Sequence, residues 1–221
     1  MLEVLKSTIL FFSTLFPVVN PMGDAPIFLL LSRDHSTAAR TALARRIAMN
    51  SFYLLAAFFL IGSHILAFFG ISIPVVQVGG GLVVIATGWK MLNQNQETEE
   101  PRAKPHQMSP GDIFQNAFYP LTMPLTVGPG SISIAITLGA NSARLHGFHF
   151  LPFIPALIAS VLIAVTVFLS YASAERLARL LGPTGMTVIL RLSSFLLVCI
   201  GVQILWNGVK ALLASLPSPA H

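Results

Sequence analysis

Six runs of apolar residues, each long enough to cross a lipid bilayer as a helix, dominate the sequence. The hydrocarbon core of a bilayer is about 30 Å thick, and a helix spans it with about 20 residues. The runs are Thr8–Leu31, Ile47–Phe69, Ile73–Leu92, Ile113–Leu138, Leu151–Tyr171 and Met186–Leu213. Charged residues make up only 10% of the chain, whereas a soluble domain contains about 25%. The sequence therefore predicts an all-α integral membrane protein with six transmembrane helices.

Prolines interrupt the first and the fourth run at matching positions. They are Pro17, Pro21 and Pro26 in the first run, and Pro120, Pro124 and Pro129 in the fourth. Proline has no N–H to donate, and its ring clashes with the carbonyl group four residues earlier, so we expect helices 1 and 4 to be broken over these stretches. Both stretches lie near the middle of their runs, and therefore near the bilayer midplane. Non-helical backbone at that depth is tolerated only where it is buried in protein or lines a cavity, which makes the breaks candidates for a functional site.

The matching breaks indicate that the chain consists of two related halves. The third and sixth runs also correspond, because the segments Gly80–Gly88 and Ser193–Gly201 carry small residues at equivalent ends. Each half contains three helices, so the second half must enter the membrane upside down relative to the first. We therefore predict one transmembrane domain over residues 1–221, made of two inverted three-helix repeats at 1–92 and 113–221. A polar linker, residues 93–112, joins the repeats and is expected in the cytoplasm.

The distribution of lysine and arginine predicts the orientation of the chain. Nine of these residues lie on one side of the predicted topology, namely Arg33, Arg40, Arg45, Arg46, Lys90, Arg102, Lys104, Arg176 and Arg179. Three lie on the other side, namely Lys6, Arg144 and Lys210. Because basic residues are enriched in cytoplasmic loops, we expect both termini on the outer, periplasmic side. The net charge of +5 is spread over short loops, which argues against nucleic acid as a partner and favours basic residues that set the orientation in the lipid bilayer.

The two breaks are expected to face each other at the centre of the protein. Short helices should follow them, at about Ala25–Leu31 and Ile132–Leu138, with both N-termini directed at the midplane. Free N–H groups at these N-termini suit a carboxylate, and the carbonyl groups freed by the prolines suit an ammonium group or a small cation. The predicted substrate-binding residues are Asn20, Pro21, Gly23, Asp24, Thr122, Pro124, Thr126, Gly128, Gly130 and Ser131.

Several of these features have alternative interpretations. Proline kinks in transmembrane helices also occur only to shape packing, so a structural role is the alternative for both breaks. Asp24 is either the N-cap of the helix that follows the first break or a carboxylate that binds a coupling proton or cation. Ser131 is a cap candidate in the same sense.

Other kinds of chemistry have no motif in this sequence. Nucleotide-binding loops, nucleophile elbows and metalloprotease helices do not occur, and the histidines lack the spacing of zinc ligands. The single cysteine, Cys199, lies in an apolar run. We therefore expect no metal site, no cofactor and no enzymatic activity, while a coupling ion, either a proton or sodium, stays open.

The two break motifs together resemble the MarC family of six-helix inner-membrane proteins. The residues that carry the resemblance are Phe16–Gly23 and Pro120–Gly130, and the likeness extends over nearly the whole chain. The resemblance implies a location in a prokaryotic plasma membrane. From family members described as neutral amino acid transporters, it also implies movement of small amino acids such as glycine or alanine.

We accordingly predict a secondary transporter of small neutral solutes that works by alternating access about the two breaks. Two alternatives are kept. An intramembrane enzyme would use Asp24 with a polar partner, but no nucleophile and base are evident at one depth. A non-transporting membrane scaffold would not need two symmetric breaks. A homo-oligomer is compatible with the sequence.

Overall fold

The computed structural model describes residues 2–32, 35–93, 117–146 and 153–215. Every secondary-structure element in this part of the chain is a helix. In chain order the elements are α1 (Leu2–Val19), α2 (Pro21–Leu31), α3 (Thr37–Phe68), α4 (Ile73–Leu92), η1 (Ala117–Thr126), α6 (Pro129–His146), α7 (Ile154–Ala172) and α8 (Ala174–Ala214). Five helical segments are long and apolar enough to cross a membrane, or six if the bent pair of η1 and α6 counts as one span. To that extent the prediction of an all-helical membrane protein is confirmed.

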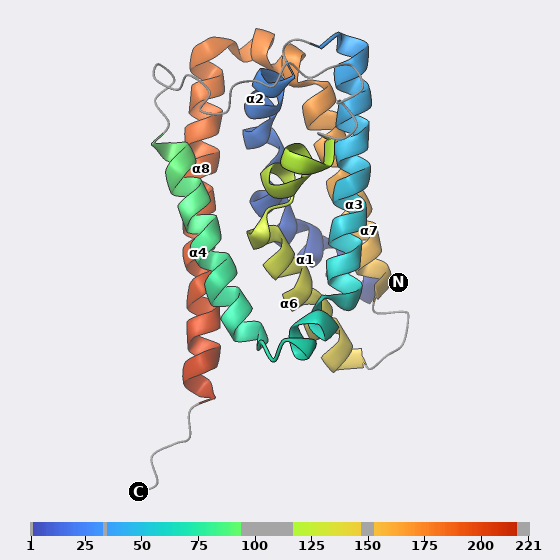
Figure 1. Ribbon diagram of the computed structural model, residues 1–221, viewed down its shortest axis with the longest axis vertical. Coiled ribbons are helices and arrows are strands. Elements are labelled where there is room, and N and C mark those ends of the chain that lie inside the picture. Colours follow the sequence, from blue (N-terminus) through green and yellow to red (C-terminus); the bar gives the residue numbers. More distant parts are fainter. Residues whose placement is uncertain (1, 33–34, 94–116, 147–152, 216–221) are drawn as a thin grey trace, which may run out of the picture.

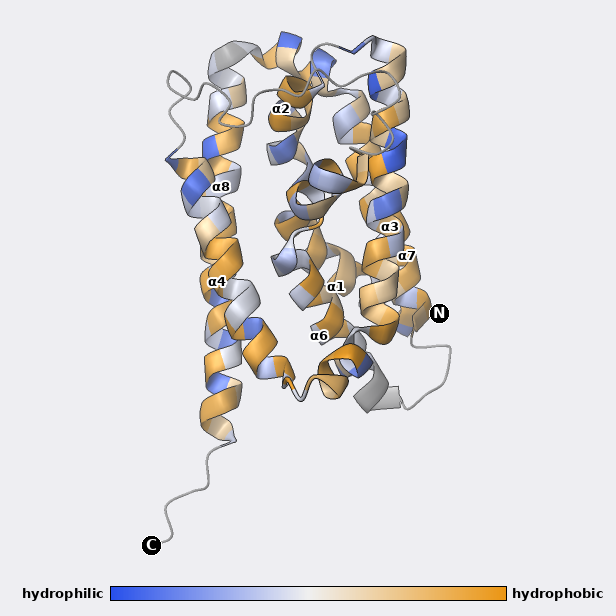
Figure 2. Cartoon of the chain, viewed as in Figure 1, coloured by the Kyte–Doolittle hydropathy of each residue, from blue (hydrophilic) through white to orange (hydrophobic). Residues whose placement is uncertain are grey.

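The helices form a pair and a larger bundle beside it. Figure 1 shows α4 and α8 side by side at one edge, α3 and α7 at the opposite edge, and α1, α2, η1 and α6 between them. Hydrophobic residues cover most of the helix surface, and hydrophilic residues gather near the upper ends of α3 and α4 (Figure 2). In the same orientation α1 begins and α8 ends in the lower half of the molecule. The first and the last helix therefore have their free ends on the same side.

Small residues bring α4 and α8 into close contact. A Cβ atom built on Gly81 would lie 2.8 Å from the carbonyl oxygen of Gly201, and one built on Gly88 would lie 2.9 Å from that of Ser194. These separations are too short for a real Cβ atom, so larger residues at either position would push the helices apart. Close backbone approach through small residues is a common way for helices to associate in lipid, where no hydrophobic effect drives them together. The two segments compared by sequence, Gly80–Gly88 and Ser193–Gly201, thus pack against each other.

Two helices extend well beyond their apolar runs. α3 begins at Thr37 rather than at Ile47, and its N-cap Ser36 accepts a hydrogen bond of 3.2 Å from the N–H of Ala39. α8 begins at Ala174, but Gly182 is non-helical inside it, and the part after this kink that could span a membrane, Thr184–Ala214, matches the predicted sixth helix. The first turns of α3 and α8 lie outside the predicted runs because hydropathy marks only the part of a helix that suits lipid. α1 likewise begins at Leu2 rather than at Thr8.

Some predicted boundaries lie outside the described residues. These are the linker 93–112 apart from Asn93, the start of the fourth run at Ile113, and the start of the fifth at Leu151. The fifth predicted helix otherwise matches α7, which ends one residue after Tyr171.

One cluster of buried apolar side chains joins α1, α2, α3, η1, α6 and α7. It includes Val19 and Val127, which lie next to the interruptions of the first and the fourth predicted helix. The packing around these two residues holds both interruptions inside the protein.

Candidate functional site

Asn20 is the residue at which the first apolar run leaves helical geometry. Its φ and ψ are both 49°, in the left-handed region, which asparagine tolerates better than most residues. The N–H of Asn20 still donates to the carbonyl oxygen of Phe16 at 2.9 Å, and its own carbonyl oxygen accepts from the N–H of Asp24 at 3.0 Å. The regular hydrogen bonds of α1 and α2 therefore meet at this residue.

The interruption is shorter than the three prolines suggest. Pro17 lies inside α1 and Pro26 inside α2, so the expected opening over the whole stretch is wrong. Pro21 is the first residue of α2. A proline is well tolerated there because the first N–H of a helix has no intrahelical partner and the fixed φ suits the helix. The helix that follows the break consequently begins at Pro21, four residues before the expected Ala25.

The second interruption separates η1 from α6, whose axes differ in direction by 71°. η1 contains the same four-residue pattern twice, X-Pro-Leu-Thr, at Tyr119–Thr122 and Met123–Thr126. Both X residues have extended rather than helical backbone angles, and both X-Pro peptide bonds are cis. α6 begins at Pro129, three residues before the expected Ile132.

The hydroxyls of the two threonines in this pattern donate to the backbone carbonyl groups five residues earlier. Thr122 Oγ1 donates to the carbonyl oxygen of Ala117 at 2.6 Å, and Thr126 Oγ1 donates to that of Leu121 at 2.8 Å. A hydroxyl has a single hydrogen to donate, so any further bond at either oxygen must be accepted. Thr122 accepts from Nδ2 of Asn50 on α3 at 3.3 Å.

Thr126 makes the corresponding contact with α7. Its Oγ1 lies 2.8 Å from the hydroxyl oxygen of Tyr171. Because the Thr126 hydrogen is directed at Leu121, Tyr171 is the donor in this bond. Two series of hydrogen bonds thus connect η1 to its neighbours. One reaches α3 through Asn50, and the other reaches α7 through Tyr171.

Asp24 completes this polar centre from the side of α2. It is only 4% exposed and lies on α2 one turn before Phe28. Phe28 stacks on the Tyr171 ring with centroids 4.6 Å apart and an interplanar angle of 11°. Residues of α2, η1 and α7 that lie far apart in the sequence therefore meet at Tyr171.

The two interruptions also lie close together. A Cβ atom built on Gly130, the second residue of α6, would lie 3.5 Å from Cγ1 of Val18 and would overlap Val84 of α4. The Asn20 side chain covers Gly23 so closely that a Cβ atom there would overlap it. Both glycines are thus required by close approach, Gly130 between helices and Gly23 beneath the asparagine.

Neither proposed cap residue is a cap. Asn20 occupies the N-cap of α2, and Asp24 is the fourth residue of that helix. Ser131 is the third residue of α6, and its buried Oγ has no hydrogen-bond partner. The cap interpretation of both residues is wrong, because the helices begin earlier than the apolar pattern suggested.

Two buried polar atoms at the interruptions have no hydrogen-bond partner among the described residues. They are Nδ2 of Asn20 and Oγ of Ser131. A buried polar group without a hydrogen bond costs about 1–3 kcal/mol, so native proteins rarely leave one unpaired without reason. A bound polar ligand would remove that cost.

The predicted site residues differ in burial. Eight are buried, namely Asn20, Pro21, Gly23, Asp24, Thr122, Thr126, Gly130 and Ser131. Gly128 is half-buried and Pro124 is exposed. The polar centre is therefore closed to bulk solvent in this conformation.

Sequence reasoning missed two residues of this centre, namely Asn50 and Tyr171. Asn50 and Ser51 are adjacent polar residues within an apolar run, and that pairing was the available signal. Tyr171 gave no signal, because it was placed at the end of its run, where an aromatic residue is ordinary in membrane proteins.

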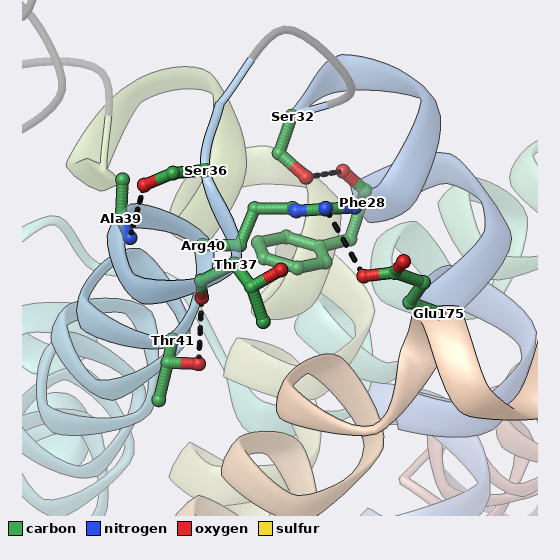
Figure 3. Close-up of polar contacts among 8 residues, drawn as sticks. All are labelled: Phe28, Ser32, Ser36, Thr37, Ala39, Arg40, Thr41 and Glu175. Carbon is green, nitrogen blue, oxygen red and sulfur yellow. Dashed lines mark hydrogen bonds and ion pairs between the residues drawn. The ribbon is translucent and has the colours of Figure 1, made fainter.

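An ion pair covers the centre from the upper end of the bundle. Arg40 Nη2, near the start of α3, lies 3.0 Å from Glu175 Oε2, near the start of α8. Figure 3 shows the Arg40 side chain extended across the Phe28 ring toward Glu175, with Ser32 beside them. Ser32 is fully buried and its Oγ donates to the Phe28 carbonyl oxygen at 2.7 Å. The ion pair and the aromatic stack thus form two successive layers above Asp24.

Comparisons with known proteins agree with this architecture. A family model described as "MarC family integral membrane protein" matches residues 5–213. The chain is 36% identical over 216 residues to a Citrobacter koseri protein named inner membrane protein MarC, covering 95% of this chain and 96% of that one. Proteins of the same name from Escherichia coli and Salmonella typhimurium are 33% and 32% identical, again over 95% of this chain and 96% of theirs. No solved structure matches the chain. Since the family model and these relatives span almost the whole sequence, the chain belongs to the MarC family of integral membrane proteins.

Proposed function

We propose that this protein is a secondary transporter of small neutral solutes, with small amino acids such as glycine or alanine as the substrate class. The observation that carries the proposal is the closed polar centre, where two adjacent helix interruptions surround buried polar atoms that lack partners. A scaffold would gain nothing from unpaired buried donors, whereas a polar solute would satisfy them.

The helix starts offer groups that fit an amino acid. The amides of Gly23 and Gly130 precede the first regular hydrogen bonds of α2 and α6, which begin at Asp24 and Ile132. Such N–H groups and the positive end of a helix dipole suit a carboxylate. Asp24 and the backbone carbonyl groups of the interruptions suit the ammonium group, and Asp24 is also the residue we propose for a coupling proton or sodium ion.

Alternating access requires two halves that move against each other, and the inverted repeat supplies them in this proposal. Support comes from the antiparallel packing of corresponding helices. Gly88 of α4 meets Ser194 of α8, while Gly208, later on α8, meets Pro74 at the start of α4. In the same way, the start of α3 reaches the end of α7 through the ion pair to Glu175.

The conformation described here corresponds to a closed state. Opening toward the upper end of the bundle would separate Arg40 from Glu175 and Phe28 from Tyr171. That end carries Arg40, Arg45, Arg176 and Arg179, so we assign it to the cytoplasm and both termini to the periplasmic side. The start of α1 and the end of α8 both lie in the lower half of the view, away from these arginines, which supports this orientation (Figure 1).

Uptake and exchange of labelled glycine and alanine by proteoliposomes test the proposal. The sharpest variant is Asn20→Gly, because glycine adopts the left-handed conformation freely and only the unpaired amide is lost. Asn20→Ala would add strain of roughly 1–2 kcal/mol at the positive φ and confuse the result. We expect saturable uptake by the wild type and a clear loss with Asn20→Gly.

Asn207→Ala, at an exposed asparagine of α8, is the matched control and should transport normally. If folded wild-type protein moves neither glycine, alanine nor any other neutral amino acid faster than protein-free liposomes do, the proposed function is wrong.

A further inference from the structure

A basic hollow lies at the upper end of the seam between α3 and α7. It has a volume of about 410 Å³, and its polar lining consists of Thr37, Thr41, Ser173, Glu175, Arg176 and Arg179. Glu175 is already paired with Arg40, so Arg176 and Arg179 leave the hollow with an excess of positive charge. The hydroxyls of Thr41 and Ser173 donate to backbone carbonyl groups, which makes Arg176 and Arg179 the charged donors available to a ligand, with the Thr37 hydroxyl beside them.

An apolar groove continues along the same seam. It has a volume of about 330 Å³ and is lined by residues of α3 and α7 that include Met49, Phe52, Tyr53, Val161, Val165 and Phe168. Tyr53 is 60% exposed and Val165 46%, so the groove opens to the outside of the bundle. Arg45 is the only charged residue of its lining and lies at the end nearest the basic hollow.

The basic hollow and the apolar groove follow one face of each helix. On α3, Thr37 and Thr41 line the hollow, while Arg45 and Met49 line the groove at the same spacing of four. Residues four apart share a helix face, so these positions form one continuous stripe. On α7, Phe168 lines the groove and Ala172, four residues later, lines the hollow. The stripe from Thr41 to Tyr53 is about 18 Å long at 1.5 Å per residue, close to the roughly 15 Å of one hydrocarbon leaflet.

The first turns of α8 place this seam at a lipid surface. Leu180 is 83% exposed directly after Arg179, and Gly182 then interrupts the helix with a φ of 63°. Figure 1 shows this part of α8 lying across the upper end of the bundle before the helix turns down beside α4. An exposed leucine beside an exposed arginine is the pattern of a segment in the membrane interface.

We propose that the α3–α7 seam binds an anionic glycerophospholipid, with its phosphate on Arg176 and Arg179 and an acyl chain in the apolar groove. Guanidinium groups bind phosphate oxygens through paired, charge-assisted hydrogen bonds. Basic pockets between transmembrane helices on the cytoplasmic side are recognised lipid headgroup sites. A free phosphate ion would occupy the basic hollow but would leave the apolar groove empty. A phospholipid would fill both, so it is the better occupant. This site is separate from the polar centre and does not depend on transport.

Native mass spectrometry of the detergent-purified full chain tests the proposal, with dioleoyl phosphatidylglycerol and dioleoyl phosphatidylcholine as probes. The acyl chains are identical, so a difference in binding reports the headgroup charge. At roughly fivefold for each arginine, we expect the phosphatidylglycerol dissociation constant to be roughly 25-fold lower than that of phosphatidylcholine. The double variant Arg176→Gln/Arg179→Gln should remove this preference. Arg46→Gln, at an exposed arginine of α3 outside both linings, should keep it.

A second pair of variants tests the acyl chain. Val165→Trp fills the apolar groove and should weaken binding of both lipids, whereas Leu162→Trp, on an exposed part of α7 outside the lining, should not. Equal binding of the two lipids by the wild type would overturn the proposal, as would equal losses in Arg46→Gln and the double arginine variant. Competition by inorganic phosphate without any preference for phosphatidylglycerol would identify a site for a soluble anion and overturn the lipid assignment.

Discussion

The hydroxyl oxygen of Tyr171 lies 2.8 Å from Oγ1 of Thr126, and this one buried hydrogen bond joins α7 to the interrupted helix η1. The same ring stacks on Phe28, which lies one turn after Asp24 on α2. Tyr171 is therefore the residue at which the elements on both sides of the polar centre are connected.

Tyr171→Phe should destabilise the protein while keeping the aromatic stack. Hydrogen bonds between helices in membrane proteins are worth about 0.6 kcal/mol on average and at most about 1.7 kcal/mol, so we expect a loss in that range. Reversible unfolding in mixed micelles measures the free energy of unfolding. Tyr53→Phe, at a 60% exposed tyrosine of α3, serves as the control. Equal stability of the two variants would show that the Tyr171 bond contributes nothing.

Arg40→Glu should expose the region beneath the ion pair by placing two carboxylates together. Ser32, fully buried beside the Arg40 side chain (Figure 3), reports this exposure when it is replaced by cysteine in a Cys199→Ala background. A partly exposed ion pair is worth about 1 kcal/mol, so we expect maleimide labelling in micelles to accelerate roughly fivefold.

Adding Glu175→Arg to Arg40→Glu recreates the pair with reversed charges and should return labelling to its original rate. Arg46→Glu is the control for a charge reversal elsewhere on α3. An increase that persists in the double reversal would mean that the attraction between residues 40 and 175 does not close the bundle.

Thr122→Val should lower stability, while Thr122→Ser should not. Valine has nearly the shape of threonine but leaves the Ala117 carbonyl oxygen without its donor and Asn50 without its acceptor. A loss of about 1 kcal/mol is expected for Thr122→Val. Thermal unfolding in detergent, followed by size-exclusion chromatography, measures the difference. The opposite order, with serine less stable than valine, would mean that methyl packing matters more than the hydroxyl.

Asp24→Asn should abolish driven accumulation of substrate but preserve exchange. The carboxylate is the charged group that a coupling proton or sodium ion would use, whereas exchange at equal concentrations needs no net coupling. Because Asp24 is not the N-cap of α2, the substitution should leave the helix start intact. Accumulation is measured under an imposed pH gradient and, separately, under a sodium gradient. Glu3→Gln, at the exposed acid of α1, is the control. Undiminished accumulation by Asp24→Asn under both gradients would exclude the coupling role.

The proposed orientation predicts that an alkaline phosphatase fused after His221 is active, because the C-terminus lies in the periplasm. A fluorescent protein that matures only in the cytoplasm should stay dark at the same position. A bright fusion there, with no phosphatase activity, would reverse the orientation and place the Arg40–Glu175 pair at the periplasmic end.

The membrane architecture and the general location of the polar centre follow from the sequence alone. Apolar runs report the free energy of transferring each segment into lipid, which does not depend on neighbouring helices. A proline has no N–H to donate, so the interruptions beside Pro21 and between Pro124 and Pro129 are marked locally, although Pro17 and Pro26 lie inside helices. Asp24, Thr122 and Thr126 could be selected because each is a polar residue next to such an interruption.

The ends of the helices and the partners of the polar groups were decided only by the tertiary structure. α3 extends ten residues before Ile47 because its first turns are polar, and no apolar signal marks them. Tyr171 and Thr126 are 45 residues apart, and Asn50 and Thr122 are 72 apart. Which faces of α3, η1 and α7 meet depends on how the whole bundle packs. Hydropathy and proline spacing describe one segment at a time, and a hydrogen bond between two segments exists only once their packing has brought donor and acceptor together.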